Sequence, residues 1–436
     1  MVRRRISSEN ILLLVILTVA FLLRFYKYHD FSLSNDELSA LFRVQYDTFR
    51  QLVDQGFYVD GHPGGIQVLL FYWVKVFGNS PESVRLPFVF MGVGAVYFIY
   101  RTGKSWFGVT AGLLAAALLA TLEFPVLYSR IARPYGSGLF FILLLTWIWS
   151  ELISSKNKSQ AWRLAIIYGF ANALCMYNHY FSFLMAFIIG VSGLFLIKRN
   201  NAVQYVTGAL LAVFLFSPHI YITANHLSIG GVGEWLGVPQ GSWIFNHLFY
   251  IFNNSWIFIA VTLVSLFLLW KGTMMNSAIR YRILCLVWFL LPLITGYFYS
   301  RYVNPVLQHS VLIFSMPFLL LFVTSFAKAP LKMREISIIL VTLIVFSSLT
   351  IFESRFYKQQ HFNDFRGVAM QTELLTNRYG KNNISYGTVV NHPWYLNYYY
   401  TKDFSVNYIM TDNKGKEDIL TFRNSLKAQQ TPHFLF

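Results

Sequence analysis

Charged residues are scarce in this chain, and acidic residues are the scarcest. Of 436 residues only 12% are charged, with 19 Asp and Glu against 35 Lys and Arg, whereas soluble domains carry about 25%. Together with a hydrophobic fraction of 56%, this composition excludes an ordinary soluble domain and indicates a polytopic membrane protein. The two cysteines, Cys175 and Cys285, both lie in apolar segments, which argues against a disulfide framework.

The formal net charge of +16 would suggest a nucleic-acid partner in a soluble protein. Here most lysines and arginines lie in short loops between apolar runs, where membrane orientation explains them. We therefore expect no nucleic acid. His and Cys residues with metal-ligand spacing are also missing from the sequence, and no internal repeat is evident.

Apolar runs predict about eleven transmembrane helices, since a span needs about 20 apolar residues. They cover residues 10–28, 84–101, 106–128, 134–152, 162–178, 180–197, 202–223, 244–270, 281–299, 305–327 and 334–352. The run 64–78 is shorter and contains Lys75. If 64–78 lies flat in the interface, with Tyr72 and Trp73 as anchors, every basic loop cluster falls on one side, as the positive-inside rule requires.

This topology places the N-terminus, read as an uncleaved first helix, in the cytoplasm and the C-terminus outside. A transmembrane domain then covers 1–353. Its first external loop, 29–83, carries two membrane-parallel helices at about 35–54 and 64–78. Residues 354–436 are more polar and form a small extramembrane α/β segment, expected to be incomplete because the sequence stops in a strand-like stretch.

External arginines stand out because the orientation rule does not explain them. They are Arg43, Arg50, Arg85, Arg130, Arg133 and Arg301. An acidic pair, Asp36-Glu37, follows the first span on the same side. A carboxylate just outside an apolar helix of a basic protein is a candidate general base at the membrane surface.

Several motifs follow one another along the sequence at or near the segments expected on the external side of the membrane. They are Arg24, Asp36-Glu37, His62-Pro63, Phe77-Gly78 to Pro87, and Tyr128-Ser129-Arg130 to Tyr135. This ordered set resembles the polyprenyl-phosphate-sugar-dependent glycosyltransferases of the GT-C fold. The nearest branch is the bacterial one related to protein O-mannosyltransferases and to the lipid A aminoarabinose transferase.

The resemblance implies an inverting transfer of a sugar from a polyprenyl phosphate to an acceptor hydroxyl. Inversion needs one base, and Asp36 matches the family's catalytic acidic position. The alternative is that Asp36 only caps the following helix. Glu37 is expected to orient neighbours, either by pairing with an arginine or by binding the acceptor, or to be a solvated first-turn residue.

The leaving phosphate needs compensating positive charge rather than a general acid. Arg133 is the first candidate and Arg130 and Arg301 the next, with lipid headgroup contact as the alternative. His62 stands where some relatives carry lysine. It is expected to contact substrate or phosphate, or to be structural.

Two further residues are candidates for supporting roles. Glu123 is expected to pair with an arginine of 130–133. His179 either lines the acceptor side or is a satisfied interfacial histidine. The first external loop has no Asp-x-Asp, which favours transfer without a metal cofactor but leaves a divalent ion open.

The expected partners are a polyprenyl-phosphate-linked sugar donor, membrane lipids, and a lipid, glycan or protein acceptor. The expected location is the bacterial cytoplasmic membrane, with the active site on the periplasmic face. The alternatives are a polysaccharide polymerase or ligase, which would favour a large late loop, and a transporter, which would favour polar residues at mid-membrane and paired halves.

The topology predicts the accessibility of single cysteines. In a chain without Cys175 and Cys285, a cysteine at Asn79 should react with an impermeant maleimide from outside intact cells. A cysteine at Asn157, between two lysines of a cytoplasmic loop, should react only after permeabilisation. Labelling of position 79 only from the cytoplasm would contradict the interfacial placement of 64–78.

Overall fold

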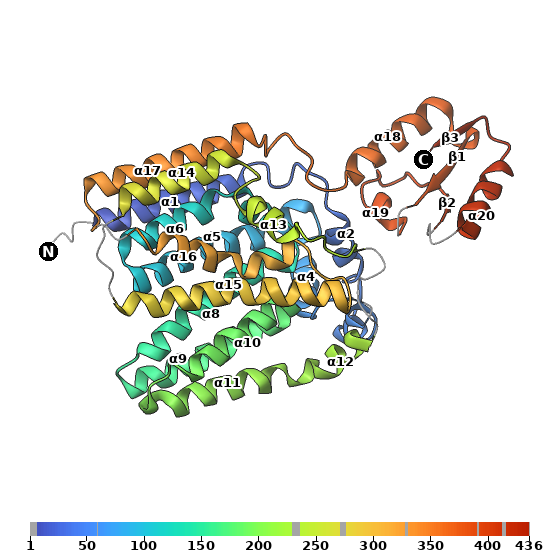
Figure 1. Cartoon of the computed structure of the whole chain (residues 1–436). Coiled ribbons are helices and arrows are strands. Elements are labelled where there is room, and N and C mark those ends of the chain that lie inside the picture. Colours follow the sequence, from blue (N-terminus) through green and yellow to red (C-terminus); the bar gives the residue numbers. More distant parts are fainter. Residues whose placement is uncertain are drawn as a thin grey trace. The chain divides into compact units, whose positions relative to one another are not determined.

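The computed structural model describes residues 7–58, 60–228, 236–270, 276–327, 330–389, 392–411 and 416–435. The chain forms two compact units (Figure 1). A helical unit comprises Met1–Tyr28 and Tyr46–Gln359, and an α/β unit comprises His29–Gln45 and Gln360–Phe436. The segment that follows the first helix, His29–Gln45, thus packs with the C-terminal residues, a grouping that the sequence alone did not indicate.

The helical unit contains the apolar helices. They are α1 (Ser8–Phe25), α3 (Phe49–Gln51), α4 (Gly65–Phe77), α5 (Pro81–Phe107), α6 (Val109–Thr121), α7 (Glu123–Tyr128), α8 (Pro134–Ser154), α9 (Lys158–Asn178), α10 (Tyr180–Leu194), α11 (Ala202–Phe216), α12 (Ile220–Ser228), α13 (Trp243–Ile251), α14 (Trp256–Leu269), α15 (Asn276–Tyr302), α16 (Met316–Thr324) and α17 (Met333–Ser348). Short 3₁₀ or π turns join them: η1 (Leu52–Phe57), η2 (Arg199–Asn201), η3 (Ser217–His219), η4 (Ser310–Phe314) and η5 (Leu349–Glu353).

Every predicted span contains helix in the structure, but three are interrupted. Within 305–327 the α-helix covers only Met316–Thr324 and follows the 3₁₀ turn η4. Within 106–128 the helix stops at Leu122, whose backbone is extended. Within 244–270, α13 and α14 meet at a bend of 65°. By length and composition, six described helices can cross a membrane, or seven if the bent pair is one span. The chain is therefore a multi-pass membrane protein, and the count of eleven stays a prediction.

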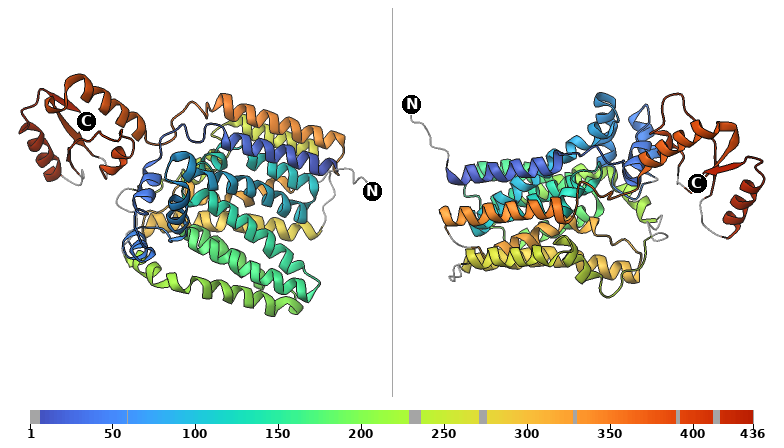
Figure 2. Two further views of the ribbon diagram at one scale, coloured as in Figure 1. Left: turned by 180° about the vertical axis from the view of Figure 1, so that it is seen from behind. Right: turned by 90° about the horizontal axis from the view of Figure 1, so that it is seen from above.

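Helix α6 lies at the centre of the helical unit, and every residue from Thr110 to Thr121 is buried. Small side chains allow this close packing. A Cβ at Gly103 of α5 would lie only 2.8 Å from the Cα of Gly112. Figures 1 and 2 show α8 to α11 side by side on one flank of this unit and α1, α14 and α17 together on another.

A buried arginine joins α1 to the end of α6. Arg24 is fully buried and donates to the carbonyls of Leu119 at 3.0 Å and Ala120 at 2.9 Å. The last carbonyls of a helix have no intrahelical partner, so the guanidinium caps α6 from a neighbouring helix. Gly92 leaves the room for it, since a Cβ there would lie 2.9 Å from Nε of Arg24.

The predicted surface helix at 64–78 is present as α4 and is too short to span a bilayer. Ile66, Leu70 and Phe71 are buried, while Tyr72 and Phe77 are exposed. The predicted helix at 35–54 is wrong as a single element. It is split into α2 (Asn35–Phe42) in the α/β unit and α3 with η1 in the helical unit.

The α/β unit has a three-stranded parallel sheet in the order β2-β1-β3. Its elements besides α2 are α18 (Phe365–Tyr379), η6 (Lys381–Asn383), β1 (Ile384–Thr388), α19 (Trp394–Asn397), β2 (Tyr408–Met410), α20 (Lys416–Lys427) and β3 (His433–Leu435). All of β1 is buried. The expected small C-terminal α/β segment is confirmed, with its helix beginning at the N-cap Asp364.

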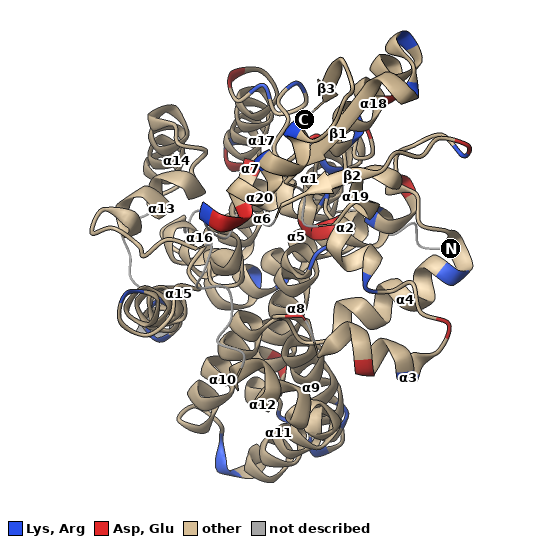
Figure 3. Cartoon of the chain, turned by 90° about the vertical axis from the view of Figure 1, so that its right-hand side faces the viewer, with Lys and Arg blue, Asp and Glu red and all other residues tan. Residues whose placement is uncertain are grey.

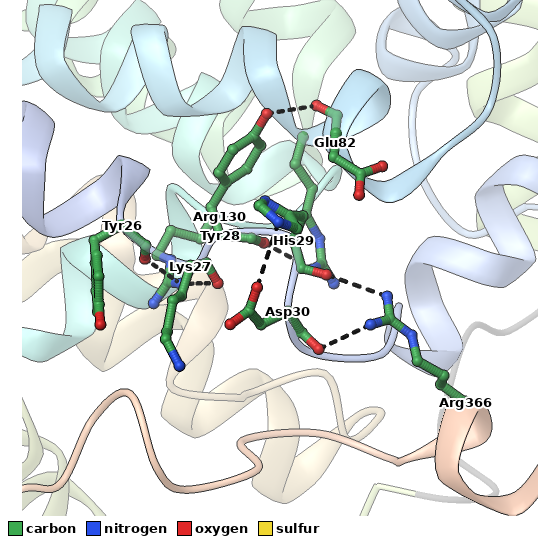
Figure 4. A network of polar contacts seen from close by, with 9 residues as sticks. Tyr26, Lys27, Tyr28, His29, Asp30, Glu82, Arg130 and Arg366 are labelled. Carbon is green, nitrogen blue, oxygen red and sulfur yellow. Dashed lines mark hydrogen bonds and ion pairs between the residues drawn. The ribbon is translucent and has the colours of Figure 1, made fainter. Parts of the chain in front are cut away.

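Hydrogen bonds join the segment His29–Gln45 to the rest of the α/β unit. Arg366 donates to the carbonyls of His29 at 3.1 Å and Asp30 at 3.0 Å (Figure 4). The hydroxyl of Tyr399 accepts from the backbone N–H of Leu33 at 2.6 Å. Helix α2 then packs on α19. The position of the acidic pair thus depends on residues more than 300 positions further along the chain.

We predict that Arg24→Met lowers the free energy of unfolding by about 2 kcal/mol, because it leaves buried carbonyls of α6 unsatisfied. Thermal or SDS unfolding in mixed micelles measures this change. Arg163→Met is the matched control, since Arg163 is exposed and loses the same charge. Equal effects of the two substitutions would rule out the capping role of Arg24.

Candidate functional site

Asp36 lies at the second position of α2, with its carboxylate half-buried. The N-cap is Ser34, whose side chain accepts from the N–H of Glu37 at 3.2 Å. The alternative that Asp36 caps this helix is therefore wrong. Among the residues that the structure describes, none forms a hydrogen bond or ion pair with the Asp36 carboxylate, which leaves this group available for chemistry.

Glu37 completes the cap of the same helix. Its Oε2 accepts from the N–H of Ser34 at 2.9 Å, and the residue is fully buried. This reciprocal arrangement is a capping box. The alternative that Glu37 is a solvated first-turn residue is therefore wrong. The cap fixes the first turn of α2 and with it the backbone position of Asp36.

A polar cluster in the helical unit surrounds His62. Nδ1 of His62 lies 3.1 Å from Oδ1 of Asp60, which is 4% exposed, and Nε2 of Gln67 donates to the other oxygen of Asp60. The ring of His62 meets the ring of His179 edge-on, with centroids 4.9 Å apart. The buried carboxylate fixes the orientation of the His62 ring.

His179 caps α10, and its Nδ1 accepts from the N–H of Phe181 at 3.0 Å. Burial, with the positive charges of His62 and Arg133 adding to it, holds the pKa of His179 well below its usual value, while Asp60 acts in the opposite direction. A neutral ring that accepts at Nδ1 carries its proton on Nε2. His179 is thus a neutral donor beside His62.

Arg133 is the one predicted phosphate ligand that lies near this cluster. It is the N-cap residue of α8, 4% exposed, and its charge acts on His179. The following Pro134 starts the helix, and its carbonyl accepts from the side chain of Asn178 at 2.6 Å. The turn between α9 and α10 therefore holds the start of α8 beside His179.

Two further histidines support the same region, and sequence reasoning missed them. Nε2 of His219 accepts from the N–H of Gly64 at 3.0 Å. His226 lies 2.7 Å from the carbonyl of Phe57 through Nε2 and 2.7 Å from the hydroxyl of Tyr180 through Nδ1. These contacts fix both sides of the loop that carries Asp60 and His62.

Arg130 contacts backbone at the end of α1. It donates to the carbonyls of Tyr26 at 3.0 Å and Lys27 at 2.7 Å, as Figure 4 shows. Its guanidinium also lies 5.1 Å from the ring of Phe356. This geometry orders the chain where it leaves the first helix.

Glu123 and Arg301 lie at other places in the helical unit. The backbone N–H of Glu123 donates to Oδ1 of Asn253 at 2.9 Å, and its side chain bonds to Ser354. Arg301 is exposed at the end of α15 and donates to the carbonyl of Pro239 at 3.2 Å. Neither contact connects these residues to His62.

Asp60 is the main residue that sequence reasoning missed. Its signal was present: acidic residues are rare, and this one stands two positions before His62. Figure 3 shows how few acidic residues interrupt the mostly uncharged helices. Among the described residues, no group of three or more His, Cys, Asp or Glu could hold a metal ion.

Comparisons with known proteins point to one group of membrane proteins. Residues 62–222 match the family model described as dolichyl-phosphate-mannose-protein mannosyltransferase. Two proteins of Bacillus subtilis (strain 168) are similar in sequence. "Putative mannosyltransferase YycA" is 30% identical over 143 residues, which cover 31% of this chain and 20% of that protein.

The second, "Putative mannosyltransferase YkcB", is 25% identical over 177 residues, or 38% of this chain and 24% of that protein. The matched regions thus span about a quarter or less of these relatives. Among solved structures, ArnT from Cupriavidus metallidurans bound to undecaprenyl phosphate has a TM-score of 0.58 at 11% identity. That likeness covers 98% of this chain and 90% of ArnT.

These findings define the class of the protein. It is a multi-pass membrane protein of the GT-C fold, as the ordered motifs predicted. Within this class, residues 62–222 resemble the lipid-linked mannosyltransferases, so the expected resemblance is confirmed. The matched region begins at His62 and includes Arg133 and His179.

We predict that Asp60 and His62 are energetically coupled. In a double-mutant cycle of Asp60→Ala and His62→Ala, the coupling in the free energy of unfolding should reach about 1 kcal/mol or more. The pair His29 and Asp30, 3.4 Å apart with side chains that are 44% and 39% exposed, is a matched control and should couple by less than about 0.5 kcal/mol. Equal coupling of the two pairs would contradict the orienting role of Asp60.

Proposed function

We propose that this chain is an inverting glycosyltransferase that moves a sugar from a polyprenyl-phosphate carrier to an acceptor hydroxyl. The observation that carries the proposal is the Asp36 carboxylate, half-buried and unpaired among the described residues on a helix turn fixed by its own capping box. The GT-C fold and the match to a mannosyltransferase family model support it. The names of the relatives point to mannose as the sugar.

Asp36 acts as the general base. Its carboxylate takes the proton of the acceptor hydroxyl while the hydroxyl oxygen attacks the anomeric carbon. The bond from this carbon to the carrier phosphate oxygen breaks on the opposite face, and the sugar inverts. The capping box restricts the backbone beneath Asp36, which reduces the cost of orienting the base.

The carrier leaves as a phosphate anion, and the helical unit offers a cluster of its own, around Arg133 and His62, that is suited to bind such an anion. Arg133 is buried, and a guanidinium in such a site stabilises negative charge more strongly than in water. Asp60 holds the Nδ1 side of the His62 ring, which leaves Nε2 for a contact with the phosphate. The fold likeness to ArnT, solved with undecaprenyl phosphate, supports a carrier of this class.

The remaining site residues take supporting roles. Glu37 holds the first turn of α2, and Arg130 orders the end of α1. His179 offers a neutral donor next to the phosphate cluster. We assign the reaction to the external face of the bacterial cytoplasmic membrane, because the distribution of basic loops places both α2 and Arg133 on that side.

We predict that Asp36→Asn lowers transfer by about 10²–10⁴-fold, the usual contribution of a positioned base, and leaves folding intact. The assay uses the full chain in nanodiscs with radiolabelled polyprenyl-phosphate mannose and membrane extract from a deletion strain as acceptor. Melting curves check the fold.

Asp54→Asn is the matched control, since Asp54 is exposed and pairs with Arg50 at 3.6 Å on the surface. It should transfer at the wild-type rate. Near-normal turnover by Asp36→Asn would show that Asp36 is not the general base. If neither wild type nor any variant transfers mannose, the assignment of polyprenyl-phosphate mannose as the donor is wrong.

A further inference from the structure

The face of α2 that carries Asp36 continues into an aromatic cluster. Along this helix Glu37, Leu38, Ala40 and Leu41 are buried. The opposite face carries Asp36, Ser39, Phe42 and Arg43, all half-buried. With 100° between successive residues, these four side chains project within one arc of about 120°.

Two aromatic side chains from the C-terminal part of the α/β unit extend this face. The ring of His392 lies 4.1 Å from that of Phe42, and the ring of Trp394 lies 5.6 Å from it, both tilted. The backbone N–H of Trp394 donates to Nδ1 of His392 at 3.3 Å, which orients the His392 ring against the backbone of Trp394. None of the three is fully buried.

The polar atoms of this face have the pattern that a sugar needs. Neither the Asp36 carboxylate nor Nε1 of Trp394 has a hydrogen-bond partner among the residues described. Nδ1 of His392 is an acceptor, so a neutral ring has its N–H donor at Nε2. A pyranose presents a face of C–H groups, which packs on aromatic rings, and a rim of hydroxyls, which requires such donors and acceptors.

We propose that Phe42, His392 and Trp394 bind a sugar ring of the acceptor, so that the acceptor of this transferase is a saccharide. This inference rests on the proposed function, because it takes Asp36 as the base that receives the acceptor hydroxyl. Phe42 stands six positions after Asp36, or about 9 Å further along the helix axis. This length suits a short glycan whose reacting hydroxyl lies at Asp36 and whose ring stacks on the cluster.

A lipid surface is the competing occupant of an aromatic cluster. Membrane-anchoring aromatics expose their rings to the bilayer, whereas Phe42 and Trp394 are half-buried, and the ring of Phe42 is tilted against those of His392 and Trp394. A carboxylate on the same helix face also disfavours insertion into lipid. These features favour a saccharide.

Saturation-transfer NMR on the full chain in nanodiscs tests this proposal without any transfer step. The probes are methyl α-mannopyranoside and methyl β-glucopyranoside, with glycerol and a blocked Ala-Ser-Ala peptide as hydroxyl compounds that lack a ring. Saturation should reach the C–H protons of the pyranosides and not the other probes. Trp394→Ala should weaken pyranoside binding roughly tenfold.

Trp394→Phe should keep most of the signal, which guards against misfolding of the alanine variant. Phe434→Ala removes an exposed ring from β3 of the same unit and should have no effect. Three results would each overturn the proposal. The first is a pyranoside signal that is equal in wild type and Trp394→Ala, and the second is saturation of the peptide in place of the pyranosides. The third is tryptophan fluorescence that brominated lipid quenches in wild type but no longer in Trp394→Ala, which would place the ring of Trp394 in lipid.

Asp36→Asn separates this inference from the proposed function. It should retain the pyranoside signal while it loses transfer. If Asp36→Asn still transfers sugar but Trp394→Ala loses pyranoside binding, the base assignment fails and the saccharide site stands.

Discussion

The structure depends on pairing backbone carbonyls that helices leave open inside an apolar bundle. A buried carbonyl without a donor costs free energy, and lipid offers no water to replace the partner. Arg24 supplies donors for the end of α6, and Arg130 supplies them for Tyr26 and Lys27. Arg85 donates to the carbonyl of Tyr28 at 2.9 Å. Few charges are present, and several of them serve this purpose.

These pairings also fix the path of the chain as it leaves α1. Lys27 has a left-handed backbone, with φ of +53°, which turns the chain at this point. The hydroxyl of Tyr357 donates to the carbonyl of Leu23, and that of Tyr28 to the carbonyl of Glu82 at 3.0 Å. The segment that continues into α2 therefore starts from a rigid anchor rather than from a frayed helix end.

The sequence predicted the elements that depend on local pattern. Apolar runs located the helices, and their ordered polar motifs led to the GT-C fold, because both signals repeat over short distances. It failed where the deciding contacts are distant in sequence. The capping role of Ser34 could be read from the pattern Ser-x-x-Glu, but the alternative considered from the sequence assigned it to Asp36. The split of 35–54 accompanies a hydrogen bond between Leu33 and Tyr399, which no local pattern reveals.

Site residues show the same division. Arg133 and His62 followed from sidedness and motif order, and the structure brings them near one another through His179. Asp60 is an exception, because it was missed although its partners His62 and Gln67 lie only two and seven positions further along the chain. Arg130 was expected at a phosphate, yet its contacts are backbone carbonyls, a partner type that composition does not show.

The grouping of His29–Gln45 with Gln360–Phe436 has a consequence for biogenesis. The ribosome makes α2 early, but the strands and helices that pack around it are synthesised only after the apolar helices that lie between them in the sequence. Until then, the acidic pair belongs to an unfinished domain. Completion of the α/β unit thus waits for the end of translation, which sets the earliest moment at which Asp36 and Glu37 reach their final positions.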